Sequence, residues 1–188
     1  MLDYGKEITC IYGEGASGKT TLAKIAAIKF AKDGKVIFID SENGFNLERF
    51  KQLGGEKYLE NIFILKPKNL EEQELQIKNL LKLKNLKLVI IDTIGHFYRI
   101  EDKKKANISM HIQFNILSEI SNKIPVILVN QIYSYNEKDK MVGGNMFKNW
   151  SKKIIKLEKD PRKIILEKPS NKQIYFEIVN EGIKLKIP

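Results

Sequence analysis

The segment that most constrains the fold lies near the start of the chain, where residues 13–20 read GEGASGKT. This matches G-x-x-x-x-G-K-[ST], a pattern that joins a buried strand to the first turn of a helix. An apolar stretch at residues 7–12 precedes it, and a segment with helical periodicity at residues 19–32 follows it. The glycines let successive backbone N–H groups turn inward around phosphate oxygens, and the helix N-terminus adds partial positive charge there. We therefore predict a phosphate-binding loop between a strand and a helix.

Within this loop the residue types have separate tasks. We expect Lys19 to reach the β- and γ-phosphates of a nucleotide, and the Thr20 hydroxyl to bind Mg²⁺. The other positions supply backbone N–H groups to the phosphates. The predicted binding residues are Gly13, Glu14, Gly15, Ala16, Ser17, Gly18, Lys19, Thr20 and Thr21. A nucleoside triphosphate with Mg²⁺ is therefore the expected ligand.

Strand-like and helix-like segments alternate along most of the chain, which is typical of a parallel sheet with helices on both faces. Further strands are predicted at residues 35–40, 62–65, 86–91 and 125–130. Three short strands, at residues 152–159, 163–168 and 174–179, end the chain. We expect one α/β domain over residues 1–188, with a mainly parallel core and a C-terminal antiparallel extension.

The helices are predicted from apolar periodicity. One short helix is expected at residues 47–53, and an amphipathic helix at residues 70–84 has an apolar face with Leu75, Leu80 and Leu83. A polar, lysine-rich loop is expected at residues 101–105. The helix after that loop is predicted from four isoleucines at four-residue spacing, namely Ile108, Ile112, Ile116 and Ile120.

Polar side chains follow three of the predicted strands, at the edge where open α/β sheets bind ligands. Asp92 ends the strand at residues 86–91 and is expected to hold the hydration shell of Mg²⁺. Glu42 follows the strand at residues 35–40 and is the candidate for orienting an attacking water, with Asp40 as the weaker choice. A polar turn is the alternative interpretation of that segment. Gln131 follows the fifth strand, where an amide can sense the terminal phosphate.

The charge is unevenly distributed along the chain. The net charge is +10; residues 1–94 carry 15 basic and 13 acidic groups, whereas residues 95–188 carry 18 and 10. A basic half indicates a polyanionic partner. The alternative is a biased or heat-adapted surface, because 30 of the 33 basic residues are lysines. Two segments are the candidate DNA contacts, with a solvated loop as the alternative for the lysine run: Arg99 with Lys103, Lys104 and Lys105, and Tyr133 with Tyr135, Lys138 and Lys140.

Several other classes of protein are disfavoured by the composition. No apolar run approaches the roughly 20 residues that span a membrane, and the start of the chain has no apolar signal segment. Cys10 is the single cysteine, which fits a buried strand position and a reducing cytoplasm. His96 and His111 are too isolated from other ligand residues for a zinc site. We expect a cytoplasmic protein.

Taken together, these segments resemble the core of archaeal and eukaryotic recombinases of the RecA type. DSENGF at residues 40–45, followed by ERF at 48–50, resembles D-T-E-G-x-F with E-R. IIDTIGHFYR at residues 90–99 resembles V-V-D-S-x-x-x-x-Y-R, and VNQIYS at 129–134 resembles T-N-Q-V-Y-S. GGN at residues 143–145, WS at 150–151 and FEIVNEGI at 176–183 match the RadB family of archaeal recombinase paralogues especially well. The resemblance covers nearly the whole chain in order.

This resemblance implies a RecA-like P-loop fold, with ATP as the nucleotide and DNA repair and recombination as the setting. Under it Glu42 is the catalytic carboxylate, Arg49 lies against the adenine, and Gln131 links the γ-phosphate to the adjacent loop. Lys19, Thr20 and Asp92 keep the roles derived above. The implied partners are single-stranded or branched DNA, a Holliday-junction resolvase and the main archaeal recombinase.

The departures from the family pattern favour an accessory role. No N-terminal helical DNA-binding domain or linker with an aromatic-x-x-Ala motif precedes the first strand, and Asn46 stands where active recombinases have Arg. The second DNA loop, at residues 133–142, is short and has no apolar wedge. We therefore expect a weak ATPase or ATP switch that binds DNA without strong sequence preference and does not promote strand exchange.

Three other P-loop classes are alternatives. A kinase of a small metabolite needs several arginines around the transferred phosphoryl group, and this chain has only Arg49, Arg99 and Arg162. A GTPase needs an N-K-x-D motif, whereas residues 130–133 read NQIY. A circadian-clock-like ATPase normally has tandem domains, which the length disfavours.

Overall fold

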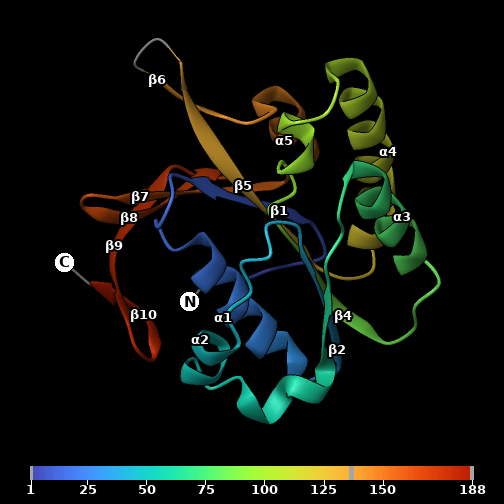
Figure 1. Ribbon diagram of the computed structural model, residues 1–188. Coiled ribbons are helices and arrows are strands. Elements are labelled where there is room, and N and C mark those ends of the chain that lie inside the picture. Colours follow the sequence, from blue (N-terminus) through green and yellow to red (C-terminus); the bar gives the residue numbers. More distant parts are fainter. Residues whose placement is uncertain (1, 136–137, 187–188) are drawn as a thin grey trace.

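The computed structural model describes residues 2–135 and 138–186. Ten strands of this described part form one sheet in the order β10-β9-β8-β7-β1-β5-β4-β2-β3, with β6 paired to β5 (Figure 1). The strands are β1 Ile8–Gly13, β2 Lys35–Asp40, β3 Ile62–Leu65, β4 Leu86–Asp92, β5 Val126–Tyr135, β6 Lys138–Met141, β7 Lys153–Lys159, β8 Arg162–Lys168, β9 Lys172–Val179 and β10 Gly182–Lys186. The helices are α1 Lys19–Ala31, α2 Leu47–Gln52, α3 Leu70–Leu80, α4 Lys103–Ser121 and α5 Gly144–Trp150, with short 3-10 turns η1 Glu56–Asn61 and η2 Phe97–Arg99.

The sheet has a parallel core and an antiparallel extension, as predicted. Strand β1 lies between β5 and β7 and is parallel to both, and β2 is parallel to its neighbours β3 and β4. The antiparallel part begins at β8 and continues to β10. Three details differ from the prediction: β7 belongs to the parallel core, β10 is an additional strand, and the segment at residues 133–142, expected as a loop, contains the end of β5 and the additional strand β6. The parallel core brings the carboxyl ends of β1, β2, β4 and β5 to one edge.

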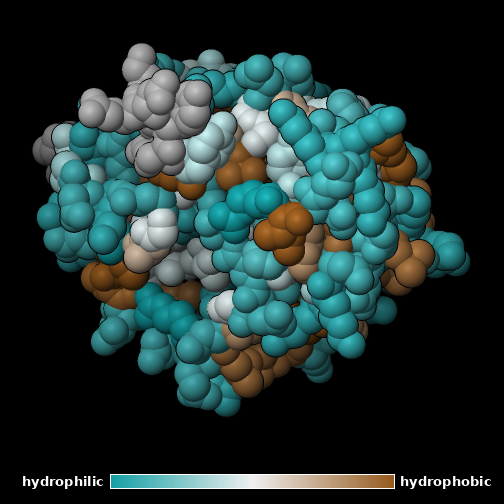
Figure 2. Space-filling model, turned by 45° about the horizontal axis from the view of Figure 1, so that its top comes forward, coloured by the Kyte–Doolittle hydropathy of each residue, from teal (hydrophilic) through white to brown (hydrophobic). Residues whose placement is uncertain are grey.

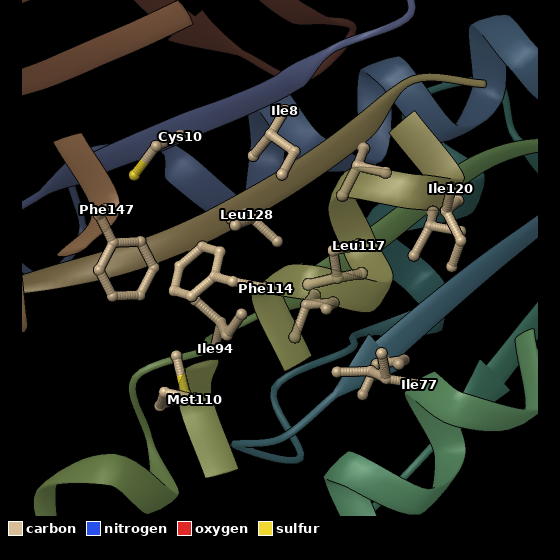
Figure 3. Close-up of a cluster of buried hydrophobic side chains, with 14 of the residues drawn as sticks. Ile8, Cys10, Ile77, Ile94, Met110, Phe114, Leu117, Ile120, Leu128 and Phe147 are labelled. Atoms are coloured by element: carbon tan, nitrogen blue, oxygen red, sulfur yellow. The ribbon is translucent and has the colours of Figure 1, made fainter. Parts of the chain in front are cut away.

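The strands of the core are buried on both faces, and alternate side chains enter two separate hydrophobic layers. On β1, Ile8 and Cys10 point into the layer beneath α3, α4 and α5, whereas Ile11 points into the layer beneath α1. The first layer contains Phe114, whose ring packs edge-on against Phe147 (Figure 3). Cys10 is fully buried in its strand, as predicted. Helices therefore cover both faces of the sheet behind the edge where the carboxyl ends of the core strands meet.

The helical predictions need three corrections. The segment at residues 101–105 is not simply a loop: α4 begins at Lys103, and Asp102 caps it by accepting from the backbone N–H groups of Lys104 and Lys105. The isoleucine row of α4 is not its buried face, because four-residue steps advance about 40° around a helix. Of the four isoleucines only Ile120 is buried, and it shares the buried side of the helix with Met110, Gln113, Phe114 and Leu117.

On α3 the predicted apolar face is also displaced. The helix ends at Leu80, four residues before the predicted end, and Leu75 and Leu83 are exposed. Its buried residues are Leu70, Gln73, Ile77 and Leu80. Among the described residues, no helix has the length and apolar character needed to cross a membrane.

Candidate nucleotide site

The loop at residues 13–18 connects β1 to α1, and its shape requires glycine at two positions. A Cβ atom on Gly13 would lie 2.2 Å from the Leu157 carbonyl oxygen, and Gly13 has a positive φ of 155°. Gly18 has a φ of 105°, and a Cβ there would lie 3.0 Å from Ile178 Cδ1. In contrast, nothing lies within 4 Å of a Cβ on Gly15. The loop therefore packs tightly against the C-terminal strands on one side and is open on the other.

Two buried polar side chains of this loop fit an anionic ligand. Lys19 is 7% exposed, and its Nζ donates to the Glu14 carbonyl oxygen at 2.6 Å. Burial lowers the pKa of Lys19, whereas the acidic groups of Asp92, Glu42 and Glu14 oppose this shift. The Ser17 hydroxyl is fully buried and has no hydrogen-bond partner among the described residues. A phosphate group would supply an acceptor for Ser17 and a counter-charge for Lys19.

Asp92 lies at the end of β4, beside the first turn of α1. Its carboxylate accepts from the Thr93 hydroxyl at 3.2 Å and is also hydrogen-bonded by Thr20. Burial raises the pKa of Asp92, an effect that the two threonine hydrogen bonds oppose. The structure thus brings together the two predicted Mg²⁺ ligands, Thr20 and Asp92. One carboxylate and one hydroxyl suit a hydrated Mg²⁺ that is also held by substrate phosphates.

The two candidate carboxylates at the end of β2, Asp40 and Glu42, have different surroundings. Both oxygens of Asp40 accept from backbone N–H groups, those of Gly44 and Phe45, at 2.9 Å each. Asp40 is 2% exposed, and its carboxylate is used to stabilise the turn. The Glu42 side chain is 32% exposed instead. The geometry favours Glu42 over Asp40 as the group that meets a ligand.

Glu42 is the centre of a cluster drawn from three segments, which we call the Glu42 cluster: Glu42, His96, Arg99 and Gln131. Glu42 Oε1 accepts from Gln131 Nε2 at 2.7 Å. The same oxygen lies 3.6 Å from Arg99 Nη2 and 3.6 Å from His96 Nδ1. Arg99 Nη1 donates to Gln131 Oε1 at 3.2 Å. Two residues expected to act on the γ-phosphate, Glu42 and Gln131, are therefore in direct contact.

Sequence reasoning missed three residues around this site. Lys24 is 2% exposed, donates to the Asn46 carbonyl oxygen at 3.2 Å and lies 4.8 Å above the Phe45 ring. Its position four residues after Thr20, on the same side of α1, was the available signal. Arg162, on β8, donates to the Ala16 carbonyl oxygen at 3.1 Å. For His96 the sequence raised only the question of a zinc site. The contacts of Arg162 and His96 could not be predicted, because their partners lie far away along the chain.

The predicted adenine contact, Arg49, is held by the C-terminal extension. Its guanidinium donates to the carbonyl oxygens of Val179 at 2.7 Å and Asn180 at 2.9 Å, and to Gln52 Oε1 at 3.1 Å. These bonds join α2 to the turn between β9 and β10. The planar face of the guanidinium is the part left for stacking on a base, so contact with adenine stays a prediction.

The candidate DNA residues are only partly brought together. Arg99, Lys103 and Tyr133 line one hollow of about 620 Å³, next to the hairpin of β5 and β6. Lys105 instead pairs with Glu71 at 2.6 Å and with Glu101 at 3.4 Å. Of the remaining candidates, Lys104 lines a different depression and Lys140 is exposed on β6. The side chains of Tyr135 and Lys138 lie outside the part that the structure describes. The face that includes this hairpin is largely hydrophilic, with hydrophobic residues in small separate groups (Figure 2).

Comparison with known proteins shows which family has this fold and sequence. The model of the RecA N-terminal domain matches residues 3–151. The DNA repair and recombination protein RadB of Methanococcus maripaludis is 34% identical, over 96% of this chain and 92% of that protein. RadB of Methanosphaera stadtmanae is 36% identical over 94% and 86%. A crystal structure of the RadB recombinase superposes with a TM-score of 0.81 at 32% identity, covering 96% of this chain and 90% of that one. The chain therefore belongs to the RadB family of RecA-type recombinases, as its motifs predicted.

Proposed function

We propose that this chain is an ATP-binding protein of DNA repair and recombination that hydrolyses ATP slowly and acts as an accessory factor. The observation that carries the proposal is the convergence of Lys19, Thr20, Asp92 and Glu42 at one edge of the parallel core. Lys19 and Thr20 begin α1, Asp92 ends β4, and Glu42 lies just after β2. Residues 1–188 act as a single RecA-like ATPase domain.

The residues at this edge fit ATP with Mg²⁺. The N–H groups of residues 13–18 and the buried Ser17 hydroxyl would hold the β-phosphate, and Lys19 would turn from the Glu14 carbonyl toward the γ-phosphate. Thr20 and Asp92 would hold Mg²⁺, which supplies charge neutralisation between the β- and γ-phosphates. Arg49 would contact the adenine. The empty side of Gly15 leaves the loop open to such a ligand.

Hydrolysis depends on Glu42 and Gln131. A carboxylate beside the γ-phosphate orients the attacking water, and the Gln131 side-chain amide donates to that carboxylate. The Gln131 backbone carbonyl accepts from the N–H of Val142, just after the hairpin, at 3.1 Å. Glu42 Oε1 already accepts from Gln131 Nε2 at 2.7 Å and lies 3.6 Å from Arg99 Nη2. Slow turnover follows, because a water must compete for that oxygen.

Contact with DNA is proposed at the hollow next to the β5–β6 hairpin. Arg99 and Lys103 supply charge for phosphates and the exposed ring of Tyr133 supplies a surface for stacking. These groups neutralise or stack without reading base edges, so binding of single-stranded or branched DNA has no strong sequence preference. The proposed role is regulatory, without strand exchange, in company with a Holliday-junction resolvase and the main archaeal recombinase.

A fluorescence-anisotropy titration with single-stranded oligonucleotides of unrelated sequences tests the DNA part, with and without ATP and Mg²⁺. The proposal predicts similar affinities across sequences and a steep loss of affinity as salt rises. Absence of binding at about 50 mM salt would replace the DNA role with that of a protein-only adaptor.

The arginines do not favour the kinase alternative. Arg49 and Arg162 both donate to backbone carbonyl oxygens, and Arg99 is engaged by Glu42 and Gln131. A phosphoryl-transfer site for a small substrate needs such side chains around the transferred group. We therefore retain the recombinase-type ATPase as the single proposal.

A further inference from the structure

The Arg99 side chain contacts both residues proposed to act on the γ-phosphate. Its Nη1 donates to Gln131 Oε1 at 3.2 Å, and its Nη2 lies 3.6 Å from Glu42 Oε1. Together with the bond from Gln131 Nε2 to the same Glu42 oxygen at 2.7 Å, these contacts form a closed triangle. His96 Nδ1 adds a fourth polar atom, 3.6 Å from Glu42 Oε1.

Such a triangle restrains Glu42 in a geometry that is poor for catalysis. Glu42 Oε1 already accepts one hydrogen bond and faces a guanidinium, so a water has few open directions toward that oxygen. Removing the guanidinium would therefore leave Glu42 more accessible to a water and free to change its position.

The triangle is easily broken from outside. The side chains of Arg99 and Glu42 are 38% and 32% exposed, and exposed ion pairs at such separations contribute little to stability. Arg99 also lines the hollow that holds Lys103 and Tyr133. A phosphodiester in that hollow would attract the same guanidinium with a charge-assisted, bidentate pair of hydrogen bonds.

We propose that Arg99 is a positioning residue that restrains Glu42 and Gln131 in the free protein and releases them when its guanidinium moves to a nucleic-acid phosphate. This inference rests on the proposed function, because it assigns a control of the same ATP site. The exchange involves hydrogen bonds and ion pairs only. Single-stranded DNA bound in the hollow would thereby accelerate ATP hydrolysis without touching the nucleotide.

Arginine suits this role because its planar group presents two separate nitrogens to two acceptors at once. Lysine has a single ammonium, which would contact either Glu42 or Gln131 but would not span both in the same fixed geometry. Arg99→Lys therefore retains the charge while weakening the restraint, and Arg99→Ala removes both. The two variants separate positioning from simple charge.

The test is single-turnover ATP hydrolysis by the full chain in excess over ATP, with and without oligo-dT. The variants are Arg99→Ala, Arg99→Lys and, as a charge-matched control, Lys123→Ala, which lies beyond the end of α4 on an exposed pair with Glu119. Without DNA, Arg99→Ala should hydrolyse ATP about two- to fivefold faster than the unaltered protein. Nucleotide affinity should stay unchanged. Arg99→Lys should be intermediate, and Lys123→Ala should behave as the unaltered protein.

Oligo-dT should accelerate the unaltered protein and Lys123→Ala but no longer accelerate Arg99→Ala. Slower or unchanged hydrolysis by both Arg99 variants without DNA, or acceleration by oligo-dT that persists in Arg99→Ala, would overturn the inference. Failure of the proposed function has a different signature, namely no hydrolysis by the unaltered protein or no loss of nucleotide binding in Lys19→Ala. Circular dichroism of each variant confirms that the fold is retained.

Discussion

The phosphate loop and the Glu42 cluster lie at the same edge of the sheet but are held in opposite ways. The loop is positioned by close packing: Gly13 has no room for a side chain beside Leu157, and Ser17 is fully buried. The Glu42 cluster is positioned by side-chain contacts between partly exposed groups, Glu42 and Arg99 among them. The region proposed to bind nucleotide is therefore held by packing, whereas the region proposed to act on the nucleotide is held by side-chain contacts that other ligands can replace.

This difference separates binding from turnover. Changes in the loop should alter nucleotide affinity or the fold itself, because its backbone and neighbours leave no freedom to adapt. Changes in the Glu42 cluster should alter turnover or its control while the fold and nucleotide affinity stay the same.

The largest effect is expected from Glu42→Gln. The amide keeps the size of the side chain but removes the proton acceptor, so the single-turnover rate should fall by about 10²- to 10⁴-fold. Nucleotide affinity, measured by calorimetry, should be unchanged. Glu48→Gln, on the exposed side of α2, is the matched control and should keep the original rate. A loss of nucleotide affinity in Glu42→Gln would break the separation of the two regions.

Lys19→Ala should have the next largest effect, on binding rather than on turnover alone. Removing a buried ammonium that pairs with phosphate should weaken nucleotide binding at least about 30-fold. Thermal unfolding of the nucleotide-free variant should show an intact fold. Lys29→Ala, on the exposed side of the same helix, is the control and should bind nucleotide normally. Equal affinity of Lys19→Ala and the unaltered protein would contradict the site assignment.

Two glycines of the loop test whether close packing holds it, because their replacement should change the free energy of unfolding by different amounts. Gly13→Ala places a methyl group against the Leu157 carbonyl oxygen and should destabilise the protein by about 3 kcal/mol. Gly15→Ala meets open space and should change stability by less than about 0.5 kcal/mol. Denaturant unfolding of both variants measures the difference. Similar free energies of unfolding would show that the loop is not held by packing.

The smallest effect is expected at the candidate DNA surface. Lys103→Ala should lower the affinity for single-stranded DNA two- to threefold and reduce the slope of log affinity against log salt by about 0.7. Lys105→Ala should change less, because Glu71 and Glu101 already neutralise its charge. Anisotropy titrations at several salt concentrations distinguish the two lysines. A larger effect at Lys105 would show that DNA binds outside the hollow.

The phosphate loop and the parallel core could be predicted because their signals are local. The residues of the loop are adjacent in sequence, and a buried parallel strand gives a continuous apolar run such as that before Asp92. The faces of α3 and α4 could not be predicted as well, since apolar residues such as Leu75 and Ile108 occur on both sides of these helices. Which side is buried depends on how the two helices pack together.

The contacts of Arg99 could not be predicted either, because they also depend on how distant segments pack together. Its neighbours Glu42 and Gln131 lie 57 and 32 residues away in the sequence, so only the fold brings the three together. The sequence indicated an exposed cation near DNA, and the structure adds a second set of contacts for the same group. Arg162 is a similar case, because β8 reaches the loop only through the C-terminal extension.

The central claim is that the backbone of residues 13–18 and the side chain of Lys19 bind a triphosphate. A crystal structure with Mg²⁺ and a non-hydrolysable ATP analogue tests it most directly. The account predicts that the β-phosphate occupies the loop, that Lys19 Nζ leaves the Glu14 carbonyl oxygen for the γ-phosphate, and that Thr20 and Asp92 flank the metal. An analogue bound elsewhere, with Lys19 still on Glu14, would contradict it.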